Sequence, residues 1–248
     1  MYRTPALIVV TLFLFACAPD PSKDAPAATV HESEPKAEKA PEAEAKTEDK
    51  AKAAKPAVEE PAKPAEPAPK TATEPSPSEE GHVRLGGRVG FIGSKVTASQ
   101  ECMFREWSGT AVTGEKDSDW SLKIDIDAKS VFCNPDERKE WSAKLDKHLR
   151  SEDFFHVEKF PKATFESTEV RVEAEGDNTH VIKGNLTLRG KTKLVSFPAR
   201  IQITEKRVTG KAEFSINRKD FGIVYPGKAD DLIRDGVVLK LQFSGSRV

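Results

Sequence analysis

The sequence has few of the residues that usually build a metal or cofactor site. It contains three cysteines and five histidines in 248 residues, with no Cys-x-x-Cys pair and no His-Glu-x-x-His pair. Structural zinc sites need several such ligands at defined spacings, and the common metalloprotease site needs the paired histidines. We therefore expect no metal site and no cofactor.

An excess of positive charge and a second long apolar run are also missing. The net charge is −1, from 39 basic and 40 acidic residues, and the two signs alternate along the chain. Because proteins bind nucleic acid mainly through its phosphates, we expect no nucleic-acid partner. Apart from the N-terminus, no stretch approaches the roughly 20 apolar residues of a transmembrane helix.

The motifs of common enzyme classes are incomplete. Residues 222–229 nearly form a phosphate-binding loop, but Ala229 stands where a Ser or Thr hydroxyl should reach Mg²⁺. The glycines of residues 87–93 lack the dinucleotide-binding spacing and lie inside a strand pattern. No nucleophile-elbow motif occurs, although a Ser-His-Asp arrangement assembled by the fold remains open. We expect that the protein is not an enzyme.

The N-terminus has the pattern of an export signal. Arg3 precedes an apolar stretch over residues 6–15, which is too short to span a bilayer as a helix. Residues 14–17, Leu-Phe-Ala-Cys, look like a bacterial lipobox, in which cleavage before the cysteine leaves Cys17 lipidated. We expect a signal peptide over residues 1–16 and membrane anchoring through Cys17. The alternative is an ordinary signal peptide in which Cys17 is incidental.

The residues after Cys17 predict where in the cell the protein is located and how flexible its N-terminal segment is. Ala18, instead of an aspartate, follows the cysteine, which resembles the outer-membrane sorting signal of proteobacteria. We expect a lipid-anchored protein of the cell envelope, at the outer membrane and facing the periplasm. Residues 17–81 are rich in Pro, Ala, Lys and Glu and bury almost nothing, so we expect a disordered tether. As a flexible coil, about 60 residues span roughly 45 Å, which suits a passive spacer.

Residues 82–248 form the folded domain, and alternation of apolar and polar residues dominates it. The alternation is clear in residues 120–127, 195–203, 208–216 and 237–243, each typical of a half-buried strand. Turn-forming residues separate these runs. The pattern predicts an all-β domain, an antiparallel up-and-down barrel of eight strands.

Two local irregularities are expected in this barrel. The alternation changes phase between residues 163–165 and 170–172, which predicts a bulge near Ser167 or Thr168. One helix flanks the barrel: residues 134–135, Asn-Pro, are expected to open it, and its apolar stripe comprises Trp141, Leu145 and Leu149.

Cys102 and Cys133 are predicted to form a disulfide. Exported proteins oxidise such pairs, and an up-and-down order of strands brings both residues to the same end of the barrel. Closing a loop of this size stabilises the fold by about 3–4 kcal/mol in the chain-entropy model. Two separate buried thiols are the alternative.

Several segments of the domain resemble the YceI-like family, the polyisoprenoid-binding, lipocalin-like bacterial proteins. The most specific are residues 151–158, Ser-Glu-Asp-Phe-Phe-His-Val-Glu, and residues 217–222, Asn-Arg-Lys-Asp-Phe-Gly. Shorter similarities lie in residues 89–97, 107–110, 184–193 and 231–235. The sequence departs from the family pattern in two features that many members lack, the cysteine pair and the lipoprotein tether.

The resemblance implies a lipocalin-like barrel that carries a long apolar ligand, such as a polyprenyl chain, an isoprenoid quinone or a fatty amide. The alternation supports an apolar interior, with these inward residues: Val89, Phe91, Ile124, Phe165, Leu186, Phe197, Phe214 and Leu239. Alternation alone does not distinguish a cavity from a packed core. A tethered interaction module with a filled barrel therefore stays open as an alternative. The sequence also leaves open whether the protein forms a homodimer.

The residues expected to contact the ligand are Phe91, Phe154, Phe155, Phe165, Phe214, Arg218, Asp220 and Phe221. The phenylalanines would line the cavity wall, with Arg218 and Asp220 near its mouth. Arg218 has forked donors suited to a quinone carbonyl or a phosphate head. In the alternative, Arg218 forms an ion pair with a nearby carboxylate and the phenylalanines only fill the core.

Overall fold

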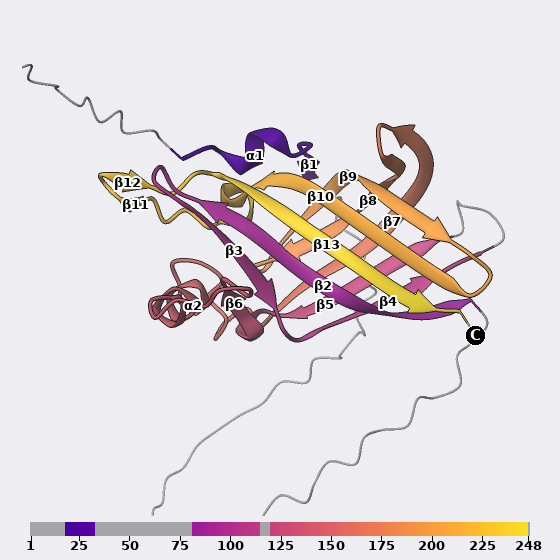
Figure 1. The fold of residues 1–248 in the computed structure, drawn as a ribbon, viewed down its shortest axis with the longest axis horizontal. Coiled ribbons are helices and arrows are strands. Elements are labelled where there is room, and N and C mark those ends of the chain that lie inside the picture. The colour runs from indigo at the N-terminus through magenta and orange to yellow at the C-terminus, as the bar shows by residue number, and fades with distance from the viewer. Residues whose placement is uncertain (1–17, 33–80, 115–119, 248) are drawn as a thin grey trace, which may run out of the picture. The chain divides into compact units, whose positions relative to one another are not determined.

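The computed structural model describes residues 18–32, 81–114 and 120–247. The expected signal peptide, Cys17 and most of the expected tether lie outside the described residues. No helix in the described part is long and apolar enough to cross a membrane. Figure 1 shows long strands running side by side, with helix α2 beside one end of them.

Eight antiparallel strands form a closed barrel, as the alternation predicts. Each strand pairs with the next, and β13 pairs with β2 to close the ring. In ring order they are β2 (His82–Ser94), β4 (Trp107–Val112), β5 (Ser121–Asp127), β7 (Lys162–Glu175), β8 (Asn178–Leu188), β9 (Lys191–Ile203), β10 (Arg207–Asn217) and β13 (Gly236–Ser246).

The remaining short elements lie at one end of the barrel, which we call the mouth end. β3 (Ser99–Phe104) pairs with the last part of β2, and β6 (Val131–Cys133) pairs with β3. The other elements are η2 (Ala128–Ser130), α2 (Ser142–Arg150), η3 (Arg218–Phe221), β11 (Gly227–Lys228) and β12 (Asp231–Leu232). At the opposite end, which we call the far end, lie the turns from β7 to β8 and from β9 to β10, together with the end of β4 and the start of β5.

The predicted bulge in the strands is confirmed. The pairing of β7 with β8 shifts register between Ser167 and Glu169, at the expected bulge. The bulge lets both halves of β7 bury apolar side chains, since Phe165 before it and Val170 after it are both buried. The turn from β8 to β9 places Arg189 and Gly190 at positive φ, which suits a tight two-residue hairpin.

The predicted start of the helix is wrong. α2 begins at Ser142, and Trp141 is 44% exposed instead of lying on a buried stripe. Asn134 has a φ of 54°, outside the helical region, so the chain does not enter a helix there. The Ser142 hydroxyl accepts hydrogen bonds from the Lys139 amide and from the Asn134 side chain, both at 3.0 Å. These bonds stabilise residues 134–141 as a loop.

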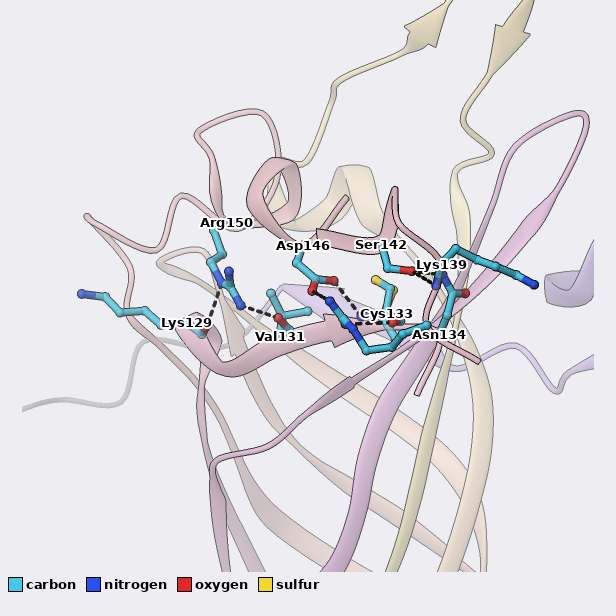
Figure 2. A network of polar contacts seen from close by, with 10 residues as sticks. Lys129, Val131, Cys133, Asn134, Lys139, Ser142, Asp146 and Arg150 are labelled. Atoms are coloured by element: carbon cyan, nitrogen blue, oxygen red, sulfur yellow. Dashed lines mark hydrogen bonds and ion pairs between the residues drawn. A yellow bond between two sulfur atoms is a disulfide. The ribbon is translucent and has the colours of Figure 1, made fainter. Parts of the chain in front are cut away.

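α2 is fixed to the barrel by polar contacts as well as by Leu149. The Asp146 carboxylate accepts a hydrogen bond from the Cys133 amide at 2.8 Å and forms an ion pair with Arg138 at 3.0 Å. At the other end of the helix, Arg150 donates to the carbonyls of Lys129 and Val131, each at 2.7 Å. Figure 2 shows these contacts joining α2 to β6 and the turn before it.

The predicted disulfide is confirmed. Cys102 of β3 and Cys133 of β6 are bonded and lie directly opposite each other in the strand register. Both are almost fully buried. The bond therefore joins β3 to the strand on which α2 is fixed, at the mouth end.

Residues 18–32 correct the predicted tether, because they are ordered on the barrel. They contain α1 (Pro21–Asp24) and β1 (Thr29–Glu32), and we call them the N-terminal strap. The Asp20 side chain caps α1 by accepting from the Ser22 amide at 3.1 Å. Ala28 and Val30 pack on the buried core. The composition of the segment concealed these few contacts, which are enough to order it.

Removal of the disulfide should destabilise the domain. Cys102 and Cys133 are separated by 31 positions, and a loop of that length contributes about 3–4 kcal/mol in the chain-entropy model. We expect the Cys102→Ser/Cys133→Ser double variant to lose this free energy of unfolding in a urea titration. Reduction of the unaltered protein should give the same difference. A double variant as stable as the oxidised protein would contradict the prediction.

Candidate ligand-binding cavity

The interior of the barrel contains two groups of packed side chains with a cavity between them. One buried cluster includes Phe165, Phe197 and Phe214 and continues to the far end. The other includes Phe91 and Phe155 and lies at the mouth end, under α2. The cavity between them has a volume of about 160 Å³ and is lined by residues of both clusters. The interior is therefore not packed along its whole length.

The lining is almost wholly apolar, as the alternation predicts. All eight residues predicted to face inward contribute to it: Val89, Phe91, Ile124, Phe165, Leu186, Phe197, Phe214 and Leu239. The only polar or charged side chains in the lining belong to Ser94, Arg218 and Arg234, all at the mouth end. A guest in this space must be apolar, except where it reaches the mouth.

Aromatic rings form the floor of the cavity. Phe197 and Phe214 are stacked with their centroids 4.0 Å apart, and Phe165 lies 5.5 Å from Phe197. Below them the barrel is packed except for a small hollow of about 30 Å³. The Phe243 ring lies so close over Gly210 that a Cβ there would come within 2.2 Å of it. Because the described residues pack the far end this closely, we expect a ligand to enter from the mouth end or through the wall.

The mouth end brings its own aromatic side chains over the cavity. Phe154 and Phe155 follow α2 directly, and both line the cavity. Phe155 meets the Phe91 ring edge-on, with centroids 5.7 Å apart. Phe154 packs against His148 and Tyr225, at 4.9 and 5.6 Å. The position of α2 therefore determines where these two rings lie.

Arg218 lies at the mouth but is occupied by protein partners. It is 4% exposed. Its guanidinium donates to the carbonyls of Arg234 (3.0 Å), Ile223 (2.7 Å) and Ile233 (3.2 Å) and to the carboxylate of Asp235 (3.1 Å). Burial lowers the pKa of Arg218, and the Asp235 charge opposes this shift. The carboxylate partner considered in the sequence analysis is present, and the side chain joins η3 to the segment that follows it.

The structure does not bring all predicted ligand residues together. Phe91, Phe154, Phe155, Phe165, Phe214 and Arg218 line the cavity, whereas Asp220 and Phe221 are not among its lining residues. Phe221 is fully buried in the core beneath η3. In the sequence, both residues share one motif with Arg218, but a single turn of helix points neighbouring side chains in different directions.

Sequence reasoning missed the lining residues that come from the irregular segment after η3. Ile223, Ile233 and Arg234 line the mouth side of the cavity. This segment has no alternation long enough to predict which side chains turn inward. Only the apolar character of Ile223 and Ile233 was a signal.

The volume of the cavity limits the size of the ligand that fits inside it. A cavity of about 150 Å³ lined by Leu, Ile and Phe holds a molecule the size of benzene, whereas pockets for drug-sized ligands occupy about 300–1,000 Å³. At 160 Å³, this cavity accommodates a short apolar group. A longer chain must extend through the mouth or displace side chains.

Comparison with known proteins gives both sequence and structural relatives. The protein YceI of Salmonella arizonae is 41% identical over 127 residues, which cover 48% of this chain and 61% of that protein. YceI of Salmonella newport matches to the same extent. The match therefore spans less than two thirds of the length of these relatives.

Two solved structures share the fold. BcnA of Burkholderia cenocepacia aligns with a TM-score of 0.53 and 20% identity, over 63% of this chain and 94% of that chain. A polyisoprenoid-binding domain from Saccharophagus degradans, implicated in plant cell wall breakdown, aligns with a TM-score of 0.51 and 15% identity, over 68% of this chain and 100% of that chain. Residues 82–244 match the YceI-like domain, so this chain belongs to the YceI-like family.

Proposed function

We propose that the barrel binds a long apolar lipid, a polyprenyl chain, isoprenoid quinone or fatty amide, as a carrier or reservoir. The observation that carries the proposal is the apolar cavity between the two core clusters. Each CH₂ group buried there contributes about 0.8 kcal/mol before ordering costs. Because a long chain exceeds the cavity volume, its first part occupies the cavity and the rest leaves through the mouth.

The relatives support this proposal. The structure from Saccharophagus degradans is described as a polyisoprenoid-binding domain, and the match to the YceI-like domain runs from the start of β2 to Ser244 of β13. The alternative of an interaction module requires a filled interior, and the cavity speaks against it. The lining offers no pair of facing acid and base groups, which favours binding over catalysis.

We further propose that the protein acts at the cell envelope, anchored through acylated Cys17 in the outer membrane and facing the periplasm. The lipobox pattern of residues 14–17 supports this location. A reservoir for lipid is most useful beside a bilayer, because the free concentration of such a chain in water is very low.

Filling the cavity should remove the ligand without unfolding the protein. Ala163 is buried and lines the cavity, so Ala163→Phe places a ring in the space that the ligand would use. We expect the lipid recovered per protein molecule to fall at least about tenfold, since loss of two buried CH₂ groups already costs about 1.6 kcal/mol. The measurement is lipid extraction followed by mass spectrometry.

The matched control for this variant is Thr164→Phe, one position along β7. Alternation turns its side chain away from the lining, so the bound lipid should be unchanged. Equal lipid content in the two variants would contradict binding in the cavity. Absence of lipid from the gently purified unaltered protein, with no uptake from added polyprenol, would contradict the proposed function itself.

Replacement of Arg218 should affect stability more than lipid binding. Arg218→Met leaves three carbonyls and Asp235 without their donors, and a buried group left unpaired costs about 1–3 kcal/mol. We expect a clear loss of free energy of unfolding and an unchanged lipid content in the folded fraction. Loss of lipid at unchanged stability would instead show that Arg218 contacts the head of the ligand.

Acylation of Cys17 is tested by the mass of the N-terminal peptide of the native protein. We expect a mature chain that begins at Cys17 and carries diacylglycerol and an amide-linked acyl chain. The Cys17→Ala variant should lose membrane association on fractionation. A native chain with an unmodified Cys17 would contradict the anchor.

A further inference from the structure

The N-terminal strap occupies a gap in the barrel wall. β9 pairs with β10 only through residues 200–203, although both strands continue toward the mouth end. β1 pairs with β9 across this gap, with Thr29 opposite Ser196. On the other side, the Ala28 amide donates to the Ser215 carbonyl of β10 at 2.9 Å. The strap therefore completes the wall where the two strands separate.

Side chains support this docking on both faces of the strap. Ala28 and Val30 pack on the core of the barrel. Glu32 forms an ion pair with Lys193 of β9, and the hydrogen bond from Lys193 lowers the pKa of Glu32. α1 lies so close to β13 that a Cβ on Gly236 would come within 2.6 Å of the Ser22 Cβ. Figure 1 shows the strap, in indigo, beside β10.

The strap begins at the mouth of the cavity. The Ala18 amide donates to the Val96 carbonyl at 3.1 Å. The Arg234 guanidinium donates to the carbonyls of Ala18 and Pro19, at 2.6 and 2.8 Å. Arg234 also lines the cavity, so one side chain joins the mouth to the first described residue of the chain.

The surface beside this point carries an exposed apolar side chain. Leu232 of β12 is 49% exposed, and its carbonyl accepts from the Val96 amide at 3.1 Å. Val224, in the same segment, is 63% exposed. Ala18 is bonded directly to Cys17, so their Cα atoms are about 3.8 Å apart. The residue that follows the expected lipid anchor therefore lies at the mouth and close to Leu232.

We propose that the N-terminal strap holds the mouth of the barrel against the membrane in which Cys17 is anchored. This inference rests on the proposed acylation of Cys17. A lipid then passes between bilayer and cavity without crossing water. If the strap were not docked, the chain between Cys17 and the barrel would be the flexible tether expected from the sequence, with a span of roughly 45 Å, and the mouth would have no fixed direction.

The test compares two ends of the native lipoprotein in vesicles of phosphatidylethanolamine and phosphatidylglycerol that contain nitroxide-labelled lipid. One fluorophore is attached at Ala229→Cys, in the exposed turn between β11 and β12, and another at Glu205→Cys, in the exposed turn at the far end. These sites are roughly 25–30 Å apart along the barrel axis. We expect strong quenching at position 229 and little at position 205.

Two variants release the strap, each with a matched control. Val30→Asp places a charge against the core, whereas His31→Asp places it on the exposed side of β1. Gly236→Ala displaces α1 from the barrel side, whereas Gly86→Ala meets nothing within 4 Å. We expect Val30→Asp and Gly236→Ala to abolish the difference in quenching between the two ends. The controls should keep it.

Hydrogen exchange of residues 26–32 separates the possible failures. A protected strap with equal quenching at both ends overturns the proposed orientation and leaves the anchor intact. Rapid exchange of the strap in the anchored, folded protein overturns the docking. A protein with unmodified Cys17 that does not bind vesicles overturns the membrane placement together with the anchor, while lipid binding by the cavity is judged separately by extraction.

Discussion

Because β13 pairs with β2, the eight strands form a ring and enclose an interior whose width depends on the number of strands. A ring of eight is just wide enough for side chains to fill it or to leave room for one small ligand. The two halves of this barrel use that width differently. Phe243 and its neighbours pack the far end. The aromatic rings at the mouth end and those at the floor of the cavity are separated by the cavity itself.

At the mouth end, other groups replace the hydrogen bonds that strand pairing provides elsewhere. Backbone groups that leave a sheet must find other partners when they are buried. The Cys133 amide finds Asp146, and three carbonyls of the segment after η3 find Arg218. The separated parts of β9 and β10 find the N-terminal strap. Arg218, which was expected to bind the head of the ligand, thus serves first to build the opening.

The regular part of the fold was predictable because a strand in a closed barrel has only one inner face. Alternation therefore identified the inward residues from Val89 to Leu239, and the phase change located the bulge after Ser167. The irregular part was not predictable in this way. Ile223 and Ile233 line the cavity from a segment without periodicity, and Asn134 leaves the helical region through its positive φ.

For the N-terminal strap and for Arg218, the expectation from the sequence also differs from the structure. Average composition describes residues 18–32 as part of a tether, yet Ala28, Val30 and the Asp20 cap suffice when a preformed gap offers hydrogen bonds to the backbone. Arg218 was expected to donate to the head of the ligand, but the three backbone carbonyls that accept from it belong to a segment without regular alternation. In both cases the partners are distant in the chain, and only the fold brings them together.

The position of β1 also has a consequence for assembly. Thr29 is synthesised early, but the groove that receives it is bounded by Ser196 and Ser215, which are made much later. Parts of the wall must therefore close before the first ordered segment of the chain finds its place. Long-range pairing of this kind forms slowly, and β1 has no complete partner until β9 and β10 are in place.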